Sequence, residues 1–159
     1  MERTNARSQG SMPLVLIAIA ALLIVARIAT HFMKSDEGPS DLVNWVELED
    51  ATRLAASSNR PVLMDFTAEW CAPCHVLDEE VFRDPLLAKA INQRFIAVRI
   101  TDRQREDGRN SKEVEALQRR YGVRGFPTVI IADAAGTERG RMEGYGGREQ
   151  FRRVMESIR

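Results

Sequence analysis

Hydrophobic residues between positions 42 and 159 fall into short apolar runs that alternate with segments of helical periodicity. Three runs have the length and the β-branched or aromatic content of buried strands, at residues 61–68, 95–100 and 128–132. A fourth strand is predicted at residues 139–144, because a turn signal at Ala135-Gly136 precedes it. The chain therefore contains at least three strands that a folded domain would bury.

Helical periodicity fills the intervals between these strands. The predicted helices cover residues 49–57, residues 72–82, segments beginning near 85 and 110, and residues 151–158. Asp84 is a suitable N-cap and Pro85 a suitable first helical residue. Asn110 is the predicted cap of the next helix, with Glu113 completing a capping box, and residues 101–109 before it form a charged loop. This order predicts an α/β sandwich in which helices flank a mixed β-sheet.

The N-terminal segment has a different pattern. Residues 12–26 carry no charge, and the apolar stretch reaches residue 33 if Arg27 and His31 extend to the lipid head groups. A helix over residues 12–33 is about 33 Å long, and a bilayer core is about 30 Å thick. A transmembrane signal-anchor is predicted there. A cleaved signal peptide is the main alternative, although no good cleavage site follows the apolar run, and a buried soluble helix is a third.

This interpretation divides the chain into a cytoplasmic segment at 1–11, the anchor at 12–33, a polar linker at 34–41 and one domain at 42–159. Formal net charge is zero for the whole chain, but residues 1–35 hold four basic side chains and one acidic one. Residues 36–159 therefore carry three more acidic than basic side chains and show no basic cluster, which argues against nucleic-acid binding. Basic residues flank the anchor on both sides, so charge alone does not fix its orientation.

The chain has two cysteines, Cys71 and Cys74, separated by two residues. A disulfide-stabilised secreted scaffold would use more cysteines at wider spacing. A structural zinc site needs four ligands, and the two histidines include His31 in the apolar leader, so no metal site is predicted. An isolated C-x-x-C pair indicates redox chemistry, the alternative being two core cysteines that never react.

The motif Trp70-Cys71-Ala72-Pro73-Cys74-His75 directly follows a predicted strand and begins a predicted helix. Backbone N–H groups and the dipole at a helix N-terminus stabilise a thiolate, so the pKa of Cys71 is expected to lie below that of a free thiol. Cys74, one turn further, is expected to be more buried and protonated. Cys71 would attack a substrate disulfide, and Cys74 would resolve the mixed disulfide.

Asp65 is the single charge in its predicted strand, six residues before Cys71. A buried carboxylate without a partner is costly, so a raised pKa is expected. Such a group could act as general base for Cys74, directly or through a water molecule. An exposed position on an edge strand is the alternative.

Two segments resemble the signature sequences of the thioredoxin family, VLMDFTAEWCAPC at residues 62–74 and YGVRGFPT at residues 121–128. The resemblance extends over about residues 42–158 and implies a thioredoxin fold. Within this family the chain is similar to the C-terminal thioredoxin-like domain of the thiol:disulfide interchange protein DsbD. That domain likewise has a segment such as VFRDP, here at residues 81–85, and a long polar loop, here at residues 101–110. The single apolar span offers no counterpart to the multi-helix electron conduit of DsbD.

The resemblance implies that the Phe126-Pro127 peptide bond is cis and faces the cysteine pair. Backbone beside Pro127 would pair with a substrate peptide, while Phe126 and Trp70 would contact it. From the residues alone, Pro127 could simply begin a strand and Trp70 could be a packing residue.

Three further residues are expected to tune the reduction potential of the pair. Ala72 and Pro73 lie between the cysteines, and His75 stands where thioredoxin has a lysine. The same histidine makes the motif C-x-x-C-H, the attachment pattern of c-type haem, so a haem electron carrier is one alternative function. A redox-inactive adaptor with a thioredoxin fold is another.

The Ala72-Pro73 dipeptide and the resemblance to reducing domains together favour a protein-disulfide reductase, and no cofactor is expected. Its expected partners are disulfide-bearing proteins and a membrane thiol reductase that supplies electrons. Its expected place is the periplasmic face of a bacterial inner membrane, or the periplasm if the leader is cleaved. The direction of electron flow does not follow from the spacing, since it depends on how well the thiolate is stabilised.

Overall fold

The computed structural model describes residues 16–24 and 42–158 and divides the chain into two units, residues 1–39 and 40–159. Residues 16–24 are helical, with exposed apolar side chains. Within the described ranges, no helix has both the length and the hydropathy needed to cross a bilayer. Most of the predicted anchor, and all of the predicted segments 1–11 and 34–41, lie outside the described residues.

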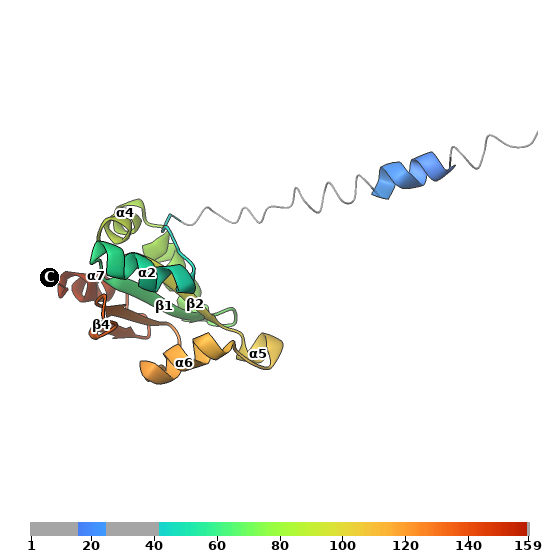
Figure 1. Ribbon diagram of the computed structural model, residues 1–159. Helices are drawn as coiled ribbons and strands as arrows, with labels where there is room; N and C mark the ends of the chain where they lie inside the picture. Colours follow the sequence, from blue (N-terminus) through green and yellow to red (C-terminus); the bar gives the residue numbers. More distant parts are fainter. Residues whose placement is uncertain (1–15, 25–41, 159) are drawn as a thin grey trace, which may run out of the picture. The chain divides into compact units, whose positions relative to one another are not determined.

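The second unit is built on one four-stranded mixed sheet (Figure 1). Its strands are β1 (Val62–Ala68), β2 (Ile96–Asp102), β3 (Thr128–Ala132) and β4 (Glu138–Glu143). They lie in the order β2-β1-β3-β4, with β1 parallel to β2 and antiparallel to β3, and with β3 antiparallel to β4. All four strands agree with the sequence prediction to within about two residues at each end. Because β1 is an interior strand, the active-site segment that follows it begins from the middle of the sheet.

Helical segments precede, connect and follow the strands (Figure 1). Their bounds are α2 (Leu48–Ser58), α3 (Ala72–Leu77), the π-helical η1 (Asp78–Phe82), α4 (Pro85–Arg94), α5 (Gln104–Asp107), α6 (Lys112–Arg120) and α7 (Arg148–Glu156). The predicted helix at residues 72–82 is therefore an α-helix continued by a π-helical segment.

Two predicted helix caps have different outcomes. Asp84 caps α4 as expected, because its carboxylate accepts the backbone N–H groups of Leu86 and Leu87, each at 2.9 Å. The predicted cap Asn110 is wrong by one residue. Ser111 caps α6 by accepting the N–H of Val114, while Asn110 is engaged with Asp102 and Arg103.

Residues alternate between the two faces of the sheet, as the period of two along a strand requires. Leu63 of β1 belongs to an apolar cluster formed with α3, η1, α4 and α7. Met64 and Phe66 of the same strand belong to a second cluster, formed with α2 and α6. The domain is therefore a three-layer α/β sandwich with a core on each face, and the expected fold class is confirmed for this unit.

Candidate active site

Cys71 and Cys74 form a disulfide at the beginning of α3, with an S–S distance of 2.06 Å. Cys71 is the N-cap of that helix, and its Sγ accepts the backbone N–H of Cys74 at 3.2 Å. Pro73 lies in the first turn, where a missing N–H costs the helix no hydrogen bond. The strand, the turn and the capped helix thus place two sulfur atoms at a helix N-terminus, as the motif predicts.

Both cysteines are buried in this disulfide form. Cys71 is 2% exposed and Cys74 is 3% exposed. The expectation that Cys74 would be more buried than Cys71 is therefore wrong for the oxidised state. The physical reason is that the two residues pack with Ala68 in one small cluster, against which the partly buried Phe126 also packs.

The Phe126-Pro127 peptide bond is cis, as the resemblance implied. The backbone N–H of Gly144 donates to the Pro127 carbonyl at 2.8 Å, and β3 begins directly afterwards at Thr128. Trp70 is 47% exposed, and its ring makes an edge contact with Phe126 at a centroid distance of 5.9 Å. Phe126, the residue before Pro127, thus contacts both the Trp70 ring and the cluster that contains the cysteine pair.

Ala72, Pro73 and His75 are exposed on α3 and its first turn. The Nε2 atom of His75 lies 3.0 Å from the backbone oxygen of Glu69. This contact ties the side chain to the loop that precedes the cysteines.

Asp65 is buried, at 2% exposure, and the interior position of β1 rules out the exposed-edge alternative. It is not unpaired, which corrects the expectation from sequence. The Nε atom of Arg99 lies 3.3 Å from Asp65 Oδ2. The pair exists because Asp65 and Arg99 are register partners on the parallel strands β1 and β2, so their side chains leave the same face.

Arg99 also contacts other groups on this face, among them Asp78, Trp45 and Phe82. Its Nη2 donates to Asp78 Oδ1 at 2.5 Å, and its guanidinium lies 4.3 Å from the centroid of the Trp45 ring. Sequence reasoning missed both Arg99 and Asp78. Arg99 offered a usable signal, because it is the basic residue of a second apolar strand, as Asp65 is the acidic residue of the first.

The segment after β2 was predicted to be a charged loop, but it contains the short helix α5. Its Arg103 donates to Glu69 at 2.8 Å and to Asp107 at 2.6 Å. The guanidinium carbon of Arg105 lies 4.6 Å from the Trp70 ring centroid. This segment therefore contacts both residues that precede Cys71, an arrangement that no local pattern in the sequence indicates.

Asp102, at the end of β2, fixes the two ends of this segment. It accepts hydrogen bonds from Asn110 at 2.6 Å, from Gln118 at 2.8 Å and from the backbone of Gln104 at 3.1 Å. Burial by itself would raise the pKa of Asp102, but the hydrogen bonds from Gln118, Asn110 and Gln104 hold that pKa below its ordinary value. The fold thus stabilises the ionised carboxylate of Asp102.

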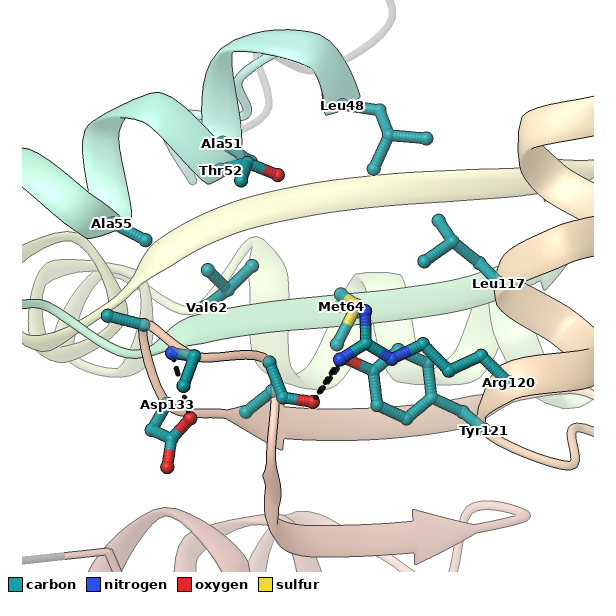
Figure 2. A pocket seen from close by; sticks show the side chains of 14 residues that line it. Leu48, Ala51, Thr52, Ala55, Val62, Met64, Leu117, Arg120, Tyr121 and Asp133 are labelled. Atoms are coloured by element: carbon teal, nitrogen blue, oxygen red, sulfur yellow. Dashed lines mark hydrogen bonds between the residues drawn. The ribbon is translucent and has the colours of Figure 1, made fainter.

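A cavity of about 130 Å³ lies elsewhere in the domain, between α2, α6, β1 and the β3–β4 turn (Figure 2). Its lining is mainly apolar, for example Leu48, Ala51 and Leu117. At one edge, Arg120 and the Tyr121 hydroxyl donate to the carbonyl oxygen of Gly136, at 2.9 and 3.1 Å. Ligand pockets usually enclose about 300–1,000 Å³. None of the predicted site residues lines this smaller space, so it is not part of the candidate active site.

Comparison with known proteins shows the family of the chain. A family model described as a thioredoxin-like domain matches residues 48–159. The thiol:disulfide interchange protein DsbD of Pectobacterium atrosepticum is 31% identical over 113 residues, which are 70% of this chain and 18% of that protein. The chain spans about a fifth of the length of the curated relatives that it matches.

Solved structures show the same likeness. A thioredoxin from Thermus thermophilus has a TM-score of 0.61 and 27% identity, covering 73% of this chain and 86% of that one. The C-terminal domain of DsbD from Neisseria meningitidis, in its oxidised form, has a TM-score of 0.54 and 25% identity, covering 70% of this chain and 93% of that one. The expected resemblance is confirmed.

Proposed function

The chain belongs to the thioredoxin-like family, and its two cysteines form a disulfide. We propose that it is a thiol:disulfide oxidoreductase that reduces protein disulfides. The observation that carries this proposal is the Cys71–Cys74 disulfide at the N-terminus of α3, beside the cis Phe126-Pro127 bond. The likeness to DsbD supports the reducing direction.

In the proposed reaction, the reduced protein begins as a Cys71 thiolate and a Cys74 thiol. Cys71 attacks one sulfur of a substrate disulfide, so the substrate S–S bond breaks and a mixed disulfide forms. Cys74 then loses its proton and attacks Cys71 Sγ, which releases the second substrate thiol. Two electrons pass to the substrate, and the protein is left with the Cys71–Cys74 bond.

The assignment of Cys71 as the attacking residue rests on its surroundings. Its Sγ accepts the N–H of Cys74 at the N-terminus of a helix, and the same N–H would stabilise a negative sulfur. Cys74 lies inside the first turn of α3, where it serves as the resolving thiol.

Asp65 is the proposed acceptor of the Cys74 proton. It extends from β1 on the face that α3 covers, and Arg99 holds its carboxylate from β2. Removing the proton from Cys74 makes this sulfur nucleophilic at the moment when the mixed disulfide must be resolved. Arg99 acts only through Asp65 and is a positioning residue.

The substrate peptide is proposed to lie along the backbone beside Pro127, with Trp70 and Phe126 contacting the residues around its cysteine. Trp70 is exposed enough for this role, and Phe126 packs against the cluster that contains the buried Cys71. Ala72 and Pro73 lie between the cysteines, His75 follows them, and all three are exposed, which suits the proposed tuning of the reduction potential.

The proposed partners are disulfide-bearing proteins and, as electron donor, a membrane thiol reductase of the DsbD kind. The proposed location is the periplasmic face of a bacterial inner membrane, with residues 12–33 as a tether. A tether raises the effective concentration of a membrane-embedded donor. A periplasmic domain released by signal cleavage is the alternative.

The direction of electron flow is tested by the reduction potential of the Cys71–Cys74 couple, measured by equilibration with glutathione. A reductase should have a potential near that of thioredoxin, about −270 mV, whereas a strong oxidant such as DsbA lies near −120 mV. Wild type should also catalyse reduction of an insulin disulfide by dithiothreitol, and Cys71→Ser should not. A potential above about −150 mV would reject the reductase.

The two other functions that the sequence left open have no specific support among the described residues. A c-type haem bonds to both cysteine sulfurs of its motif, whereas here the sulfurs are bonded to each other. A redox-inactive adaptor would not need the pair to cycle. Catalysed insulin reduction therefore also distinguishes the proposed enzyme from the adaptor.

A further inference from the structure

The helix α5 places an arginine on the ring that borders the reactive sulfur. Arg105 stacks on Trp70, and Trp70 is the residue immediately before Cys71. The Trp70 ring also contacts Phe126, which packs against the cluster that contains Cys71 and Cys74, so the pair of Arg105 and Trp70 lies next to the cysteine site. A partner whose cysteine reaches Cys71 must therefore pass close to Arg105.

Two arginines of this segment differ in how their charge is balanced. Arg103 is bonded to the carboxylates of Glu69 and Asp107. Arg105 forms no ion pair with a carboxylate of residues 16–24 or 42–158, and its partner is the Trp70 ring. Arg103 therefore links α5 to the loop before the cysteines, while the guanidinium of Arg105 is in contact with a ring and is not paired with a carboxylate of the described residues.

Stacking leaves the hydrogen-bonding edge of a guanidinium available. The group contacts an aromatic ring through its face, whereas its five N–H donors lie in its plane. That planar fork matches a carboxylate with two parallel hydrogen bonds. The ring also limits the motion of Arg105, so a ligand carboxylate would have to order little of the side chain.

The helix α5, which carries Arg105, is held in place by side-chain hydrogen bonds. Asp102 bonds to Gln104 at one end of α5 and to Asn110 beyond the other end, and Asn110 in turn accepts the N–H of Arg103 at 2.6 Å. Side-chain hydrogen bonds of this kind hold a short surface helix in place where its own length cannot. Arg105 is thus presented from an ordered segment.

We propose that Arg105 is a specificity-determining residue that selects partners carrying an acidic side chain next to their reactive cysteine. The inference rests on the proposed function, because the partner's sulfur must reach Cys71. The neighbouring Glu106 has the opposite charge. The selection therefore comes from a short-range contact at the guanidinium edge and not from a basic surface that attracts acidic proteins over a distance.

The test uses three disulfide-linked peptide dimers that differ only in Glu, Gln or Lys beside the cysteine. The whole chain is reduced and freed of reductant, and the second-order rate constant of a single turnover is measured for each peptide. Wild type should reduce the Glu peptide about two- to fivefold faster than the Gln peptide, and the Lys peptide more slowly still. High salt should shrink these ratios.

Three variants test whether the differences in rate among the peptides come from Arg105. Arg105→Gln should abolish the discrimination, and Arg105→Glu should invert it. Arg153→Glu makes the same change of net charge at an exposed position on α7 and should preserve the wild-type order. A uniform slowing of all three peptides by Arg105→Gln would show that Arg105 only supports Trp70 and would overturn the inference.

The two proposals fail in different ways. If wild type reduces all three peptides at one rate, the proposed function stands and the role of Arg105 is rejected. If reduced wild type reduces none of them, the proposed function fails and the inference fails with it.

Discussion

At the scale of single residues, the two cysteines are equally buried but differ in the groups around their sulfur atoms. Only Cys71 caps a helix and accepts a backbone N–H through its sulfur, whereas Cys74 supplies that N–H. The attacking and resolving roles are therefore distinguished by local electrostatics and not by solvent exposure.

This difference predicts which cysteine forms the mixed disulfide. Cys74→Ser should accumulate covalent adducts with disulfide-bearing clients, because Cys71 can still attack but nothing resolves the product. Cys71→Ser should accumulate few. Non-reducing electrophoresis and mass spectrometry of the trapped species measure this. Equal trapping by both variants would reject the assignment.

The burial of the disulfide predicts a second effect at residue scale. Phe126→Ala should make reduction of the Cys71–Cys74 bond by dithiothreitol several-fold faster, because exchange rates depend on access to the sulfur. Phe126→Leu keeps an apolar cover of similar size and serves as the matched control. If both variants react at the wild-type rate, Phe126 does not limit access.

Asp65 gives the third prediction. Asp65→Asn should slow resolution of the mixed disulfide at neutral pH by about tenfold or more, because the amide cannot accept a proton. Stability should change by only about 1 kcal/mol, since Arg99 keeps Asp78 and Trp45 as partners. Stopped-flow release of a client thiol measures the rate, and chemical denaturation measures the stability.

The matched control is Asp78→Asn, which removes the other carboxylate from Arg99 but leaves Asp65 ionisable. Resolution should be much less affected in this variant. A resolution rate in Asp65→Asn that equals wild type between pH 6 and 9 would remove Asp65 from the mechanism.

At the scale of elements, the segment from Asp102 to Asn110 is held by hydrogen bonds to the charged carboxylate of Asp102. The stability of the domain should therefore depend on pH. The folded-state pKa of Asp102 is depressed, so its contribution is fully present above the unfolded-state value, about 3.9. The contribution is lost as pH falls through the folded-state pKa. Asp102→Asn should therefore cost about 1–3 kcal/mol at pH 7 and progressively less in acid.

Urea denaturation of wild type and Asp102→Asn between pH 2 and 7 measures this difference. Glu106→Gln removes an exposed carboxylate from the same segment and should leave the pH dependence unchanged. A stability difference for Asp102→Asn that stays constant across the range would show that its charge is unimportant.

The elements also show which parts of the fold the sequence encodes locally. The bounds predicted for β3 are those observed, because a β-branched run is bounded by Pro127 and a turn. The helix α5 was missed, because its four residues carry no apolar periodicity and its support comes from Asp102, Asn110 and Gln118. Elements that are held by side-chain hydrogen bonds from outside the element leave no apolar periodicity in the sequence.

The same distinction applies to the site. Cys71, Cys74 and Pro127 were predictable because each lies in a short contiguous motif. The basic residue Arg99 in an apolar strand was a visible signal, but its partner depends on strand register, and the role of Arg105 depends on the course of a loop. The error about Asp65 has this origin too, since its partner lies on a different strand.

At the scale of the whole molecule, the proposed tether predicts the side of the membrane on which the domain works. Cys71 in intact cells should react with a membrane-impermeant maleimide after mild reduction. The alternative orientation would place the pair among cytosolic reductants, which compete with any dedicated donor. A known cytoplasmic cysteine protein should remain unlabelled in the same cells. Labelling that requires disruption of the inner membrane would reject the periplasmic location.

The fluorescence of one of the two tryptophans can report the redox state of the cysteine pair. Trp70 adjoins the disulfide, and a disulfide quenches the emission of a nearby indole. Trp45 lies instead against Arg99 and Phe82, with a ring distance of 5.0 Å to the latter. The full sequence contains no other tryptophan. Fluorescence of Trp45→Phe therefore isolates the indole beside the sulfurs, and electron transfer can be followed in real time without a label.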